Sequence, residues 1–210
     1  MRLHGFFRSS ASWRVRIALN LKGITVDHSF YKLRRGDQRA SEYLALNPQG
    51  LVPALSLDDG VTLTQSLAIL EWLEETHPGP ALLPADPLAR ARVRAFAMAV
   101  ACDIHPIQNL KILAKVQSLG HDESVSNAWA RDIITDGFQA LEEMIRNVPG
   151  PYCFGAEPTF ADICLVPQFG NARRFGVDLT AFPRLVAAEA AASALPAFAD
   201  AAPNRQPDAE

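Results

Sequence analysis

Cysteine is scarce in this chain of 210 residues. There are three cysteines, Cys102, Cys153 and Cys164, and none of them forms a Cys-x-x-Cys pair. An odd number without paired spacing excludes a disulfide framework. No cluster of cysteines and histidines has the spacing of metal ligands, which argues against a metal site. We therefore expect packed, reduced thiols and no bound metal.

Long apolar runs and an excess of basic residues are also missing. The longest apolar run, residues 95–102, is far too short to cross a bilayer, and residues 1–7 lack the apolar stretch of a signal peptide. The formal net charge is -3, so the chain has no general basic field for nucleic acid or anionic lipid. With the unpaired cysteines, these absences predict a cytoplasmic protein that binds neither nucleic acid nor a membrane.

What is present predicts a globular α/β unit at the start of the chain. Apolar residues make up 49% of the chain and charged residues 20%, enough for one large domain or two small ones. Strand and helix patterns alternate up to residue 80, with no internal repeat. The predicted strands are residues 2–7, 26–33, 52–57 and 61–64, and the predicted helices are residues 12–22, 38–46 and 66–76.

A proline-rich stretch separates this unit from a helical one. Residues 77–87 contain four prolines and a glycine, which is typical of a linker, and strand patterns end there. His105-Pro106 should kink the first long helix, and Thr159 with Asp162 has the form of a capping box. We expect the tail after Pro203 to be loose. The predicted helices are residues 88–118 and 124–147, one that begins near residue 159, and residues 183–192 and 195–201.

The junction at residues 6–17 is a candidate binding site. An apolar run ends there, three serines follow, and a helical pattern begins. Serine hydroxyls can cap the first-turn N–H groups of a helix, and the same groups together with the helix dipole form an anion site. Arg8, Arg14 and Arg16 add positive charge. From the residues alone, a capped surface helix and an anion site both stay open.

Several motifs resemble the zeta class of glutathione transferases. The stretch Arg-Ser-Ser-Ala-Ser-Trp-Arg-Val-Arg that starts at Arg8 matches the signature of that class. Further matches lie at residues 45–48, 52–53, 65–69, 82–84, 106–109, 161–162, 165–168, 174–175 and 206–208. The resemblance covers essentially the whole chain. It implies a glutathione transferase fold, with an α/β thioredoxin-like N-terminal domain at residues 1–80, a linker at 81–86 and an all-α C-terminal helical domain at 87–210.

The resemblance also implies an activity. Zeta-class enzymes include isomerases that use glutathione to convert a maleyl diketo acid, maleylacetoacetate or maleylpyruvate, to its fumaryl isomer, and the family forms homodimers. The class usually has cysteine where this chain has Ala11, so the reactive sulfur would have to come from glutathione. The alternatives are a transferase that conjugates or dehalogenates small acidic electrophiles and a glutathione-fold binding protein without turnover.

The candidate site residues follow from matching positions in the class. By resemblance, Gln65 and Ser66 hold the γ-glutamyl carboxylate, while Arg8 and Arg174 bind the carboxylates of the small diketo acid substrate. The resemblance implies a cis Val52-Pro53 bond, whereas the residues alone fit an ordinary trans proline at the start of a strand. It also implies that His105 contacts glutathione, and the alternative for His105 is a packing role. The full set for glutathione is Ser9, Ser10, Ala11, Ser12, Gln38, Val52, Gln65, Ser66, His105, Asn109 and Lys111, and the catalytic set is Ser9, Ser10, Arg8 and Arg174. Arg14 and Arg16 can instead be structural.

The energy needed to ionise a thiol selects a serine as catalyst. A free thiol with a pKa of about 8.5 must drop by roughly two units, or about 2.7 kcal/mol, before the thiolate dominates at neutral pH. A helix dipole contributes about 0.3 to 1 kcal/mol, occasionally about 2 kcal/mol, whereas a charge-assisted hydrogen bond adds roughly 1.5 to 3 kcal/mol. Ser9 or Ser10 would supply that bond, and the matching position in the class implies Ser9, with Ser10 as the second choice.

Overall fold

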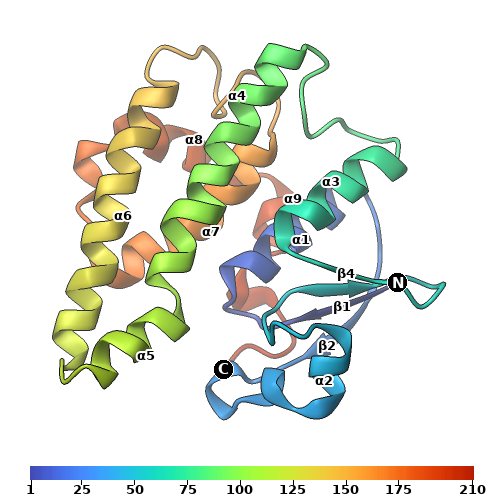
Figure 1. The fold of residues 1–210 in the computed structure, drawn as a ribbon. Coiled ribbons are helices and arrows are strands. Elements are labelled where there is room, and N and C mark those ends of the chain that lie inside the picture. The colour runs from blue at the N-terminus through green and yellow to red at the C-terminus, as the bar shows by residue number, and fades with distance from the viewer. The chain divides into compact units, whose positions relative to one another are not determined.

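The computed structural model describes residues 1–210, which form two compact units. The first unit comprises Met1–Ala81 together with Leu195–Glu210, and the second comprises Leu82–Ala194 (Figure 1). The first is α/β and the second is helical, so the predicted fold class is confirmed. The boundary at residues 81 and 82 lies at the start of the predicted linker, where proline and glycine interrupt regular structure.

A four-stranded sheet is the centre of the first unit. Its order is β2-β1-β3-β4, with β1 and β2 parallel and the other neighbours antiparallel. The helix α1 connects β1 to β2, as a parallel pair requires. The strands are shorter than their apolar patterns predict, and they span Arg2–Gly5 (β1), Asp27–Phe30 (β2), Ala54–Ser56 (β3) and Thr62–Thr64 (β4).

The helices of the first unit cover both faces of this sheet. Successive residues of β1 face opposite sides, so Leu3 and His4 point to different faces. The His4 ring contacts Tyr43 of α2, Ser41–Leu46, while α1, Ser10–Leu21, packs beside α3, Ser66–Thr76, on the other face (Figure 1).

The predicted limits of the helix at residues 38–46 are wrong. Gly36, with a φ of 84°, separates two short 3-10 turns, Leu33–Arg35 and Asp37–Arg39, and α2 begins only at Ser41. The predicted helix 38–46 is therefore a turn followed by a short helix. Its first residues lie in the turn because an extended Ala40 interrupts the helical backbone.

The second unit is a bundle of helices around an aromatic core. The predicted helix 88–118 is interrupted, because Pro106 lacks the N–H that an α-helix needs, and the expected kink is confirmed. Phe138 contacts both Phe169 and Phe182 at the centre of the bundle. The helices are Pro87–Met98 (α4), Leu110–Ser118 (α5), Glu123–Ile145 (α6), Phe160–Phe175 (α7) and Pro183–Ser193 (α8), and the interruption consists of a π-helical segment, Ala99–Ile104, and a 3-10 turn, His105–Gln108.

The predicted capping box at Thr159 is confirmed. Thr159 accepts a hydrogen bond from a first-turn N–H of α7, and the Asp162 carboxylate accepts one from the Thr159 N–H at 2.8 Å. The same carboxylate, fully buried, also accepts the Cys153 N–H at 2.8 Å. Burial raises the pKa of Asp162, and these donors partly offset that effect. Thr159 and Asp162 therefore fix the start of α7.

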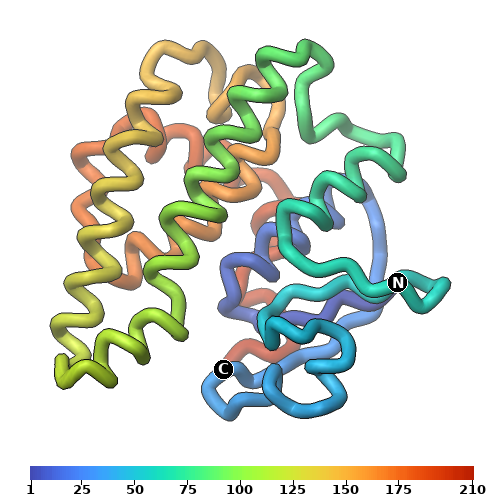
Figure 2. The backbone as a smooth tube through the Cα atoms, viewed as in Figure 1, coloured from blue at the N-terminus to red at the C-terminus, as the bar shows by residue number.

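The last residues of the chain return to the first unit. The helix α9, Pro196–Ala199, packs beside α1, and Figure 2 shows this red segment against the blue start of the chain. The compact units thus differ from the predicted domain 87–210, because residues 195–210 belong with the sheet. The predicted loose tail is wrong too. The segment Pro203–Arg205 forms a 3-10 turn, and Asp208 accepts the Phe7 N–H at 2.9 Å.

The cysteines divide into two kinds. Cys153 and Cys164 are buried, as expected for packed thiols, and burial raises the pKa of Cys153 well above its usual range. Cys102, in the π-helical segment, is exposed, against that expectation. No helix is both long and apolar enough to span a bilayer, and no group of three or more His, Cys, Asp or Glu could hold a metal ion.

Candidate functional site

The turn between β1 and α1 places Ser9 at the N-terminus of a helix. Ser9 is the N-cap of α1, which begins at Ser10 rather than at the predicted Ser12, and its Oγ accepts the Ser12 N–H at 3.2 Å. The expected serine cap is confirmed. Because a hydroxyl accepts with its lone pairs and donates its own hydrogen, capping leaves the Ser9 O–H as a donor. The half-buried Ser9 therefore combines a donor with the positive end of α1.

The other residues of the serine turn are more enclosed than Ser9. Ser10 is buried at the first position of α1, and Ala11 is half-buried. Ser12 is fully buried, and its Oγ has no hydrogen-bond partner. A Cβ atom on Gly5 would lie 3.2 Å from that Oγ, so Ser12 packs α1 closely against the end of β1.

The three arginines near the turn have different surroundings. Arg8 is exposed, with its guanidinium 6.0 Å and 5.7 Å from the ring centres of Phe6 and Phe7. Arg16 is buried and donates to the Phe7 carbonyl at 2.9 Å and to the Ala201 carbonyl at 3.0 Å. Burial lowers the pKa of Arg16 to about 10, with Asp208 opposing the shift, so it stays charged at neutral pH. Arg16 is thus a structural cation that supports the turn.

The segment before β3 adopts the conformation that the resemblance implies. The Val52-Pro53 bond is cis, which confirms that expectation, and β3 begins directly after it at Ala54. The preceding Leu51 carbonyl accepts hydrogen bonds from the Tyr43 hydroxyl at 2.6 Å and from the Asn47 side chain at 2.7 Å. These two bonds from the α2 region fix the loop that carries Val52.

The N-terminus of α3 differs from the sequence expectation. Ser66 does not cap the helix, because it is the first helical residue and Gln65 occupies the cap position without a capping side-chain bond. Gln65 has a φ of 68°, a left-handed conformation that costs energy for a residue with a side chain and that is common at binding sites. The Ser66 Oγ instead accepts a hydrogen bond from Arg14 Nη1 at 3.1 Å. This pair could not be predicted from the sequence.

Gln38 is the fourth part of the first unit that the resemblance links to glutathione. Its side chain is half-buried in the turn before α2, and Nε2 donates to the Leu33 carbonyl at 3.4 Å. The Oε1 atom is buried without a hydrogen-bond partner. A buried acceptor without a partner is costly, so this atom fits a role in holding a polar ligand.

The second unit holds the remaining predicted contacts. His105 is half-buried and opens the 3-10 turn after the π-helical segment. Asn109 is the N-cap of α5, and its Oδ1 accepts the N–H groups of Lys111 and Ile112 at 3.0 Å and 3.2 Å. The sequence missed this capping role, although Asn is a favoured N-cap residue. The Lys111 side chain is exposed.

Two neighbouring arginines at the end of α7 have separate environments. Arg173 forms a two-pronged pair with Glu189, at 3.0 Å and 2.7 Å, and this pair raises the pKa of Arg173. Arg174 is exposed, with its guanidinium 5.0 Å from the ring centre of Phe175. Arg174 therefore presents its charge at the surface, whereas Arg173 holds α7 to α8.

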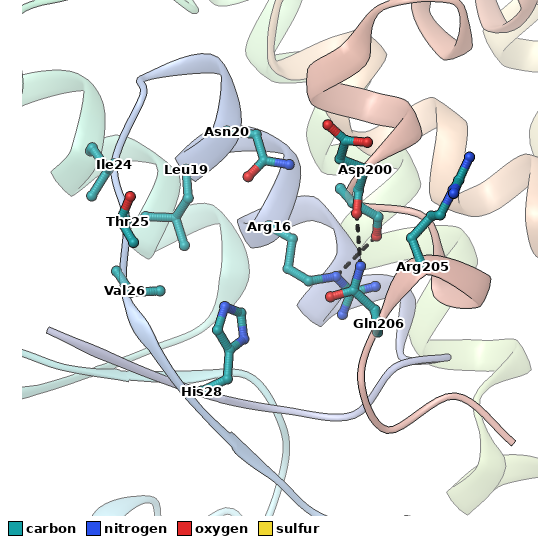
Figure 3. Close-up of a pocket in the computed structure, with 11 residues that line it drawn as sticks. Arg16, Leu19, Asn20, Ile24, Thr25, Val26, His28, Asp200, Arg205 and Gln206 are labelled. Atoms are coloured by element: carbon teal, nitrogen blue, oxygen red, sulfur yellow. Dashed lines mark hydrogen bonds between the residues drawn. The ribbon is translucent and has the colours of Figure 1, made fainter.

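A pocket in the first unit lies apart from these residues. It has a volume of about 260 Å³ and is formed by α1, residues 24–28 and the C-terminal segment 200–206 (Figure 3). The Arg16 side chain reaches across it toward Ala201, and the Gln206 side chain donates to the Asp200 carbonyl at 2.9 Å. None of the predicted catalytic or glutathione-binding residues lines this pocket, and Arg16 is the lining residue that also bonds the serine turn.

Comparison with known proteins gives matches along the whole chain. Two family models match, the N-terminal domain of glutathione S-transferase over residues 8–76 and its C-terminal domain over residues 71–200. A maleylacetoacetate isomerase of Pseudomonas aeruginosa is 48% identical over 210 residues, which span 99% of this chain and 98% of the relative.

Solved structures give the same result. The holo structure of a maleyl pyruvate isomerase, described as a bacterial zeta-class glutathione S-transferase, has a TM-score of 0.97 at 49% identity and covers 100% of both chains. A maleylacetoacetate isomerase of Methylobacterium extorquens, solved with malonate and glutathione, has a TM-score of 0.96 at 42% identity, also with 100% of both chains covered.

Proposed function

The chain belongs to the glutathione S-transferase family, and from this we propose that it is a zeta-class, glutathione-dependent cis–trans isomerase. Its substrate is a maleyl diketo acid, maleylacetoacetate or maleylpyruvate, and its product is the fumaryl isomer. Full-length likeness to proteins of both names supports the reaction class. One structural observation carries the proposal, namely the Ser9 hydroxyl, which caps α1 with its oxygen and keeps its hydrogen for a thiolate.

The residues of the first unit fit glutathione. The Gln38 Oε1 is a buried acceptor without a partner, and Gln65 holds the start of α3 in a conformation common at binding sites. When bound, glutathione supplies the thiolate that adds reversibly to the cis double bond, so that rotation and elimination give the trans product and free glutathione. We assign the extended backbone of the tripeptide to Val52 and the γ-glutamyl carboxylate to Gln65 and Ser66.

Ser9 lowers the pKa of the bound thiol. Its O–H donates to the sulfur, and the N-terminus of α1 adds the favourable dipole. Ser10 and Ala11 contribute the amide groups of the first helical turn, whereas the buried Ser12 shapes that turn through its N–H bond to Ser9. No protein thiol is needed at Ala11, because the nucleophile comes with the tripeptide.

Two exposed arginines bind the substrate. A guanidinium offers a planar fork of donors and stays charged, which suits the carboxylates of the diketo acid. Arg8 and Arg174 fill this role and stabilise the negative charge that develops on the substrate during addition. His105, Asn109 and Lys111 add contacts to the tripeptide, and Asn109 uses its amide hydrogens for this because its oxygen caps α5.

The same proposal includes where the enzyme works and in what state. Reduced glutathione is abundant in the cytoplasm, and the three cysteines form no disulfide, so we place the enzyme there. We propose a homodimer, as is usual for the family, and we propose no nucleic-acid partner because the net charge is -3.

A single assay tests the function. Maleylpyruvate or maleylacetoacetate is supplied with a catalytic amount of glutathione, and the fumaryl product and the free thiol are both followed. Product with conserved thiol is the expected result. Thiol consumed in proportion to substrate would instead identify a conjugating transferase, and neither change would leave a binding protein without turnover.

A further inference from the structure

Arg14 is a charged side chain whose position the reaction described above does not explain. It lies on α1, five residues after Ser9, and only 1% of its surface is exposed. Arginine is rarely buried to this degree, because removing its charge from water is costly unless good partners or a function compensate. Its Nη1 donates to the Ser66 Oγ at 3.1 Å, which links α1 to the first residue of α3.

The hydrogen bond from Arg14 reaches a helix end that has no side-chain cap. The first-turn N–H groups of a helix have no partner within the helix, and no side chain caps α3. A cation beside a helix N-terminus repels the positive end of the helix dipole. This arrangement is unfavourable by itself, and it becomes favourable when an anion binds there. The bond from Arg14 to Ser66 therefore lies at a helix end whose free N–H groups favour a carboxylate.

The hydrogen bond also sets the direction of the Ser66 hydroxyl. Arginine has no acceptor, so the Ser66 oxygen must accept and its hydrogen must point elsewhere. Ser66 can thus donate its hydrogen to an anion at the start of α3, and its hydroxyl does not have to rotate when the anion binds. The Ser9 hydroxyl is used in the same way, because its oxygen accepts the Ser12 N–H and its hydrogen stays available to a ligand.

We infer that Arg14 is a positioning residue that acts through Ser66 to make the start of α3 selective for the α-carboxylate of the γ-glutamyl group. The inference rests on the proposed function, since it concerns how that site holds glutathione. Arg16 offers a matched comparison, because it is the other buried arginine of α1 but donates to backbone carbonyls of the turn and the tail.

The test compares glutathione with 4-aminobutanoyl-cysteinylglycine, which lacks only the α-carboxylate of the γ-glutamyl group. Affinities are measured by titration calorimetry for the unaltered protein, Arg14→Met, Ser66→Ala and the double variant. We expect Arg14→Met and Ser66→Ala each to weaken glutathione binding about tenfold and to leave analogue binding within about twofold. The double variant should lose less than the product of the two single losses.

The comparison variant separates positioning from folding. Arg16→Lys loosens the turn, so it should weaken both ligands by the same factor or leave both unchanged. Equal loss of both ligands in Arg14→Met, or no loss of either, would overturn the inference while the isomerase assay still stood. If Arg14→Met does not fold, Ser66→Ala breaks the same bond from the other side, and an equal loss of both ligands there refutes it. An unaltered protein that binds no glutathione would refute the proposed function together with the inference.

Discussion

The carboxylate of Asp208 accepts a hydrogen bond from the backbone N–H of Phe7 at 2.9 Å, across 201 positions of the chain. Phe7 lies two residues before Ser9, on the turn that opens α1. The carbonyl of the same Phe7 accepts from Arg16, which also binds Ala201. The end of the chain therefore supports the turn that presents the Ser9 hydroxyl.

Loss of this support should reduce turnover. In Asp208→Ala the Phe7 N–H loses its acceptor, and we expect the free energy of unfolding to fall by about 1 to 2 kcal/mol and kcat to fall roughly three- to tenfold. Glu210→Gln is the matched control, because its ion pair with Lys32, at 3.0 Å, is exposed and its loss should leave the free energy of unfolding almost unchanged. Urea denaturation and the product assay measure both effects, and equal behaviour of the two variants would contradict the role of Asp208.

Removal of the Ser9 hydroxyl should raise the pKa of bound glutathione. In Ser9→Ala the thiolate loses a charge-assisted hydrogen bond of roughly 1.5 to 3 kcal/mol, so we expect an increase of about one to two pKa units. The helix cap is lost as well, at about 1 kcal/mol of stability. The pH dependence of thiolate ultraviolet absorbance gives the pKa. Ser10→Ala is the companion variant, and a larger increase there would move the catalytic role to Ser10.

The two arginines at the end of α7 should behave differently on substitution. We expect Arg174→Ala to lower kcat/KM for isomerisation about 100-fold while glutathione affinity stays within about twofold. Arg173→Ala removes the ion-pair partner of the buried Glu189 and leaves it the Ser193 hydroxyl, so it should cost about 1 kcal/mol of stability and leave kcat unchanged. Steady-state kinetics and glutathione titration separate the two outcomes. Equal loss of turnover and of glutathione binding in Arg174→Ala would refute its assignment to the substrate.

The absence of a side chain at Gly137 allows the π-helical segment to pack. A Cβ atom there would lie 2.3 Å from Cδ1 and 2.4 Å from Cγ1 of Ile104, the last residue of that segment. Gly137→Ala should therefore destabilise the protein by about 1 to 3 kcal/mol. The added change Ile104→Val removes the clashing Cδ1 and should restore part of this loss in thermal unfolding. If Ile104→Val does not restore stability, the loss in Gly137→Ala has a cause other than the contact with Ile104.

Stability should fall at mildly acidic pH through His4. Its ring nitrogens bond the Tyr31 hydroxyl at 2.9 Å and the Ser56 hydroxyl at 3.0 Å, and burial, with Arg2 as the smaller cause, lowers its pKa below the usual 6.5. The unfolded chain therefore binds a proton first as the pH falls through 6.5, and stability present above that value is lost below it. His4→Gln should flatten this part of the pH profile in urea unfolding. His28, whose pKa is also lowered, has to be replaced separately as a control.

The element types were predictable from local sequence, whereas several of their limits were not. Apolar periodicity indicated α3 at Ser66–Thr76, and the spacing of Thr159 and Asp162 indicated the start of α7. The helix 88–118 was predicted as one element, because an apolar pattern does not show where the backbone shifts from α to π spacing. Ile104, the last residue of the π-helical segment, lies against Gly137 on α6, and a contact between two helices does not show in a local apolar pattern.

The candidate site shows the same division. The serine turn, the Gln65-Ser66 pair and the paired arginines at the end of α7 could be singled out from residue types and from the family resemblance. The bond from Arg14 to Ser66 and the bond from Asp208 to Phe7 could not, because each joins residues that are distant in sequence. A hydroxyl beside a helix start also does not reveal whether it caps the helix, as Ser9 does, or accepts from an arginine, as Ser66 does.

By itself the sequence determined the α/β and helical halves, the reaction class through its motifs, and the need for a nucleophile from outside the protein, since Ala11 has no thiol. Only the tertiary structure decided that residues 195–210 belong with the sheet, that Arg16 is structural, and that Arg14 points to Ser66. The reason is physical. Periodicity and capping follow from neighbours along the chain, but the partner of a buried charge is whichever group the folded backbone brings within hydrogen-bond distance.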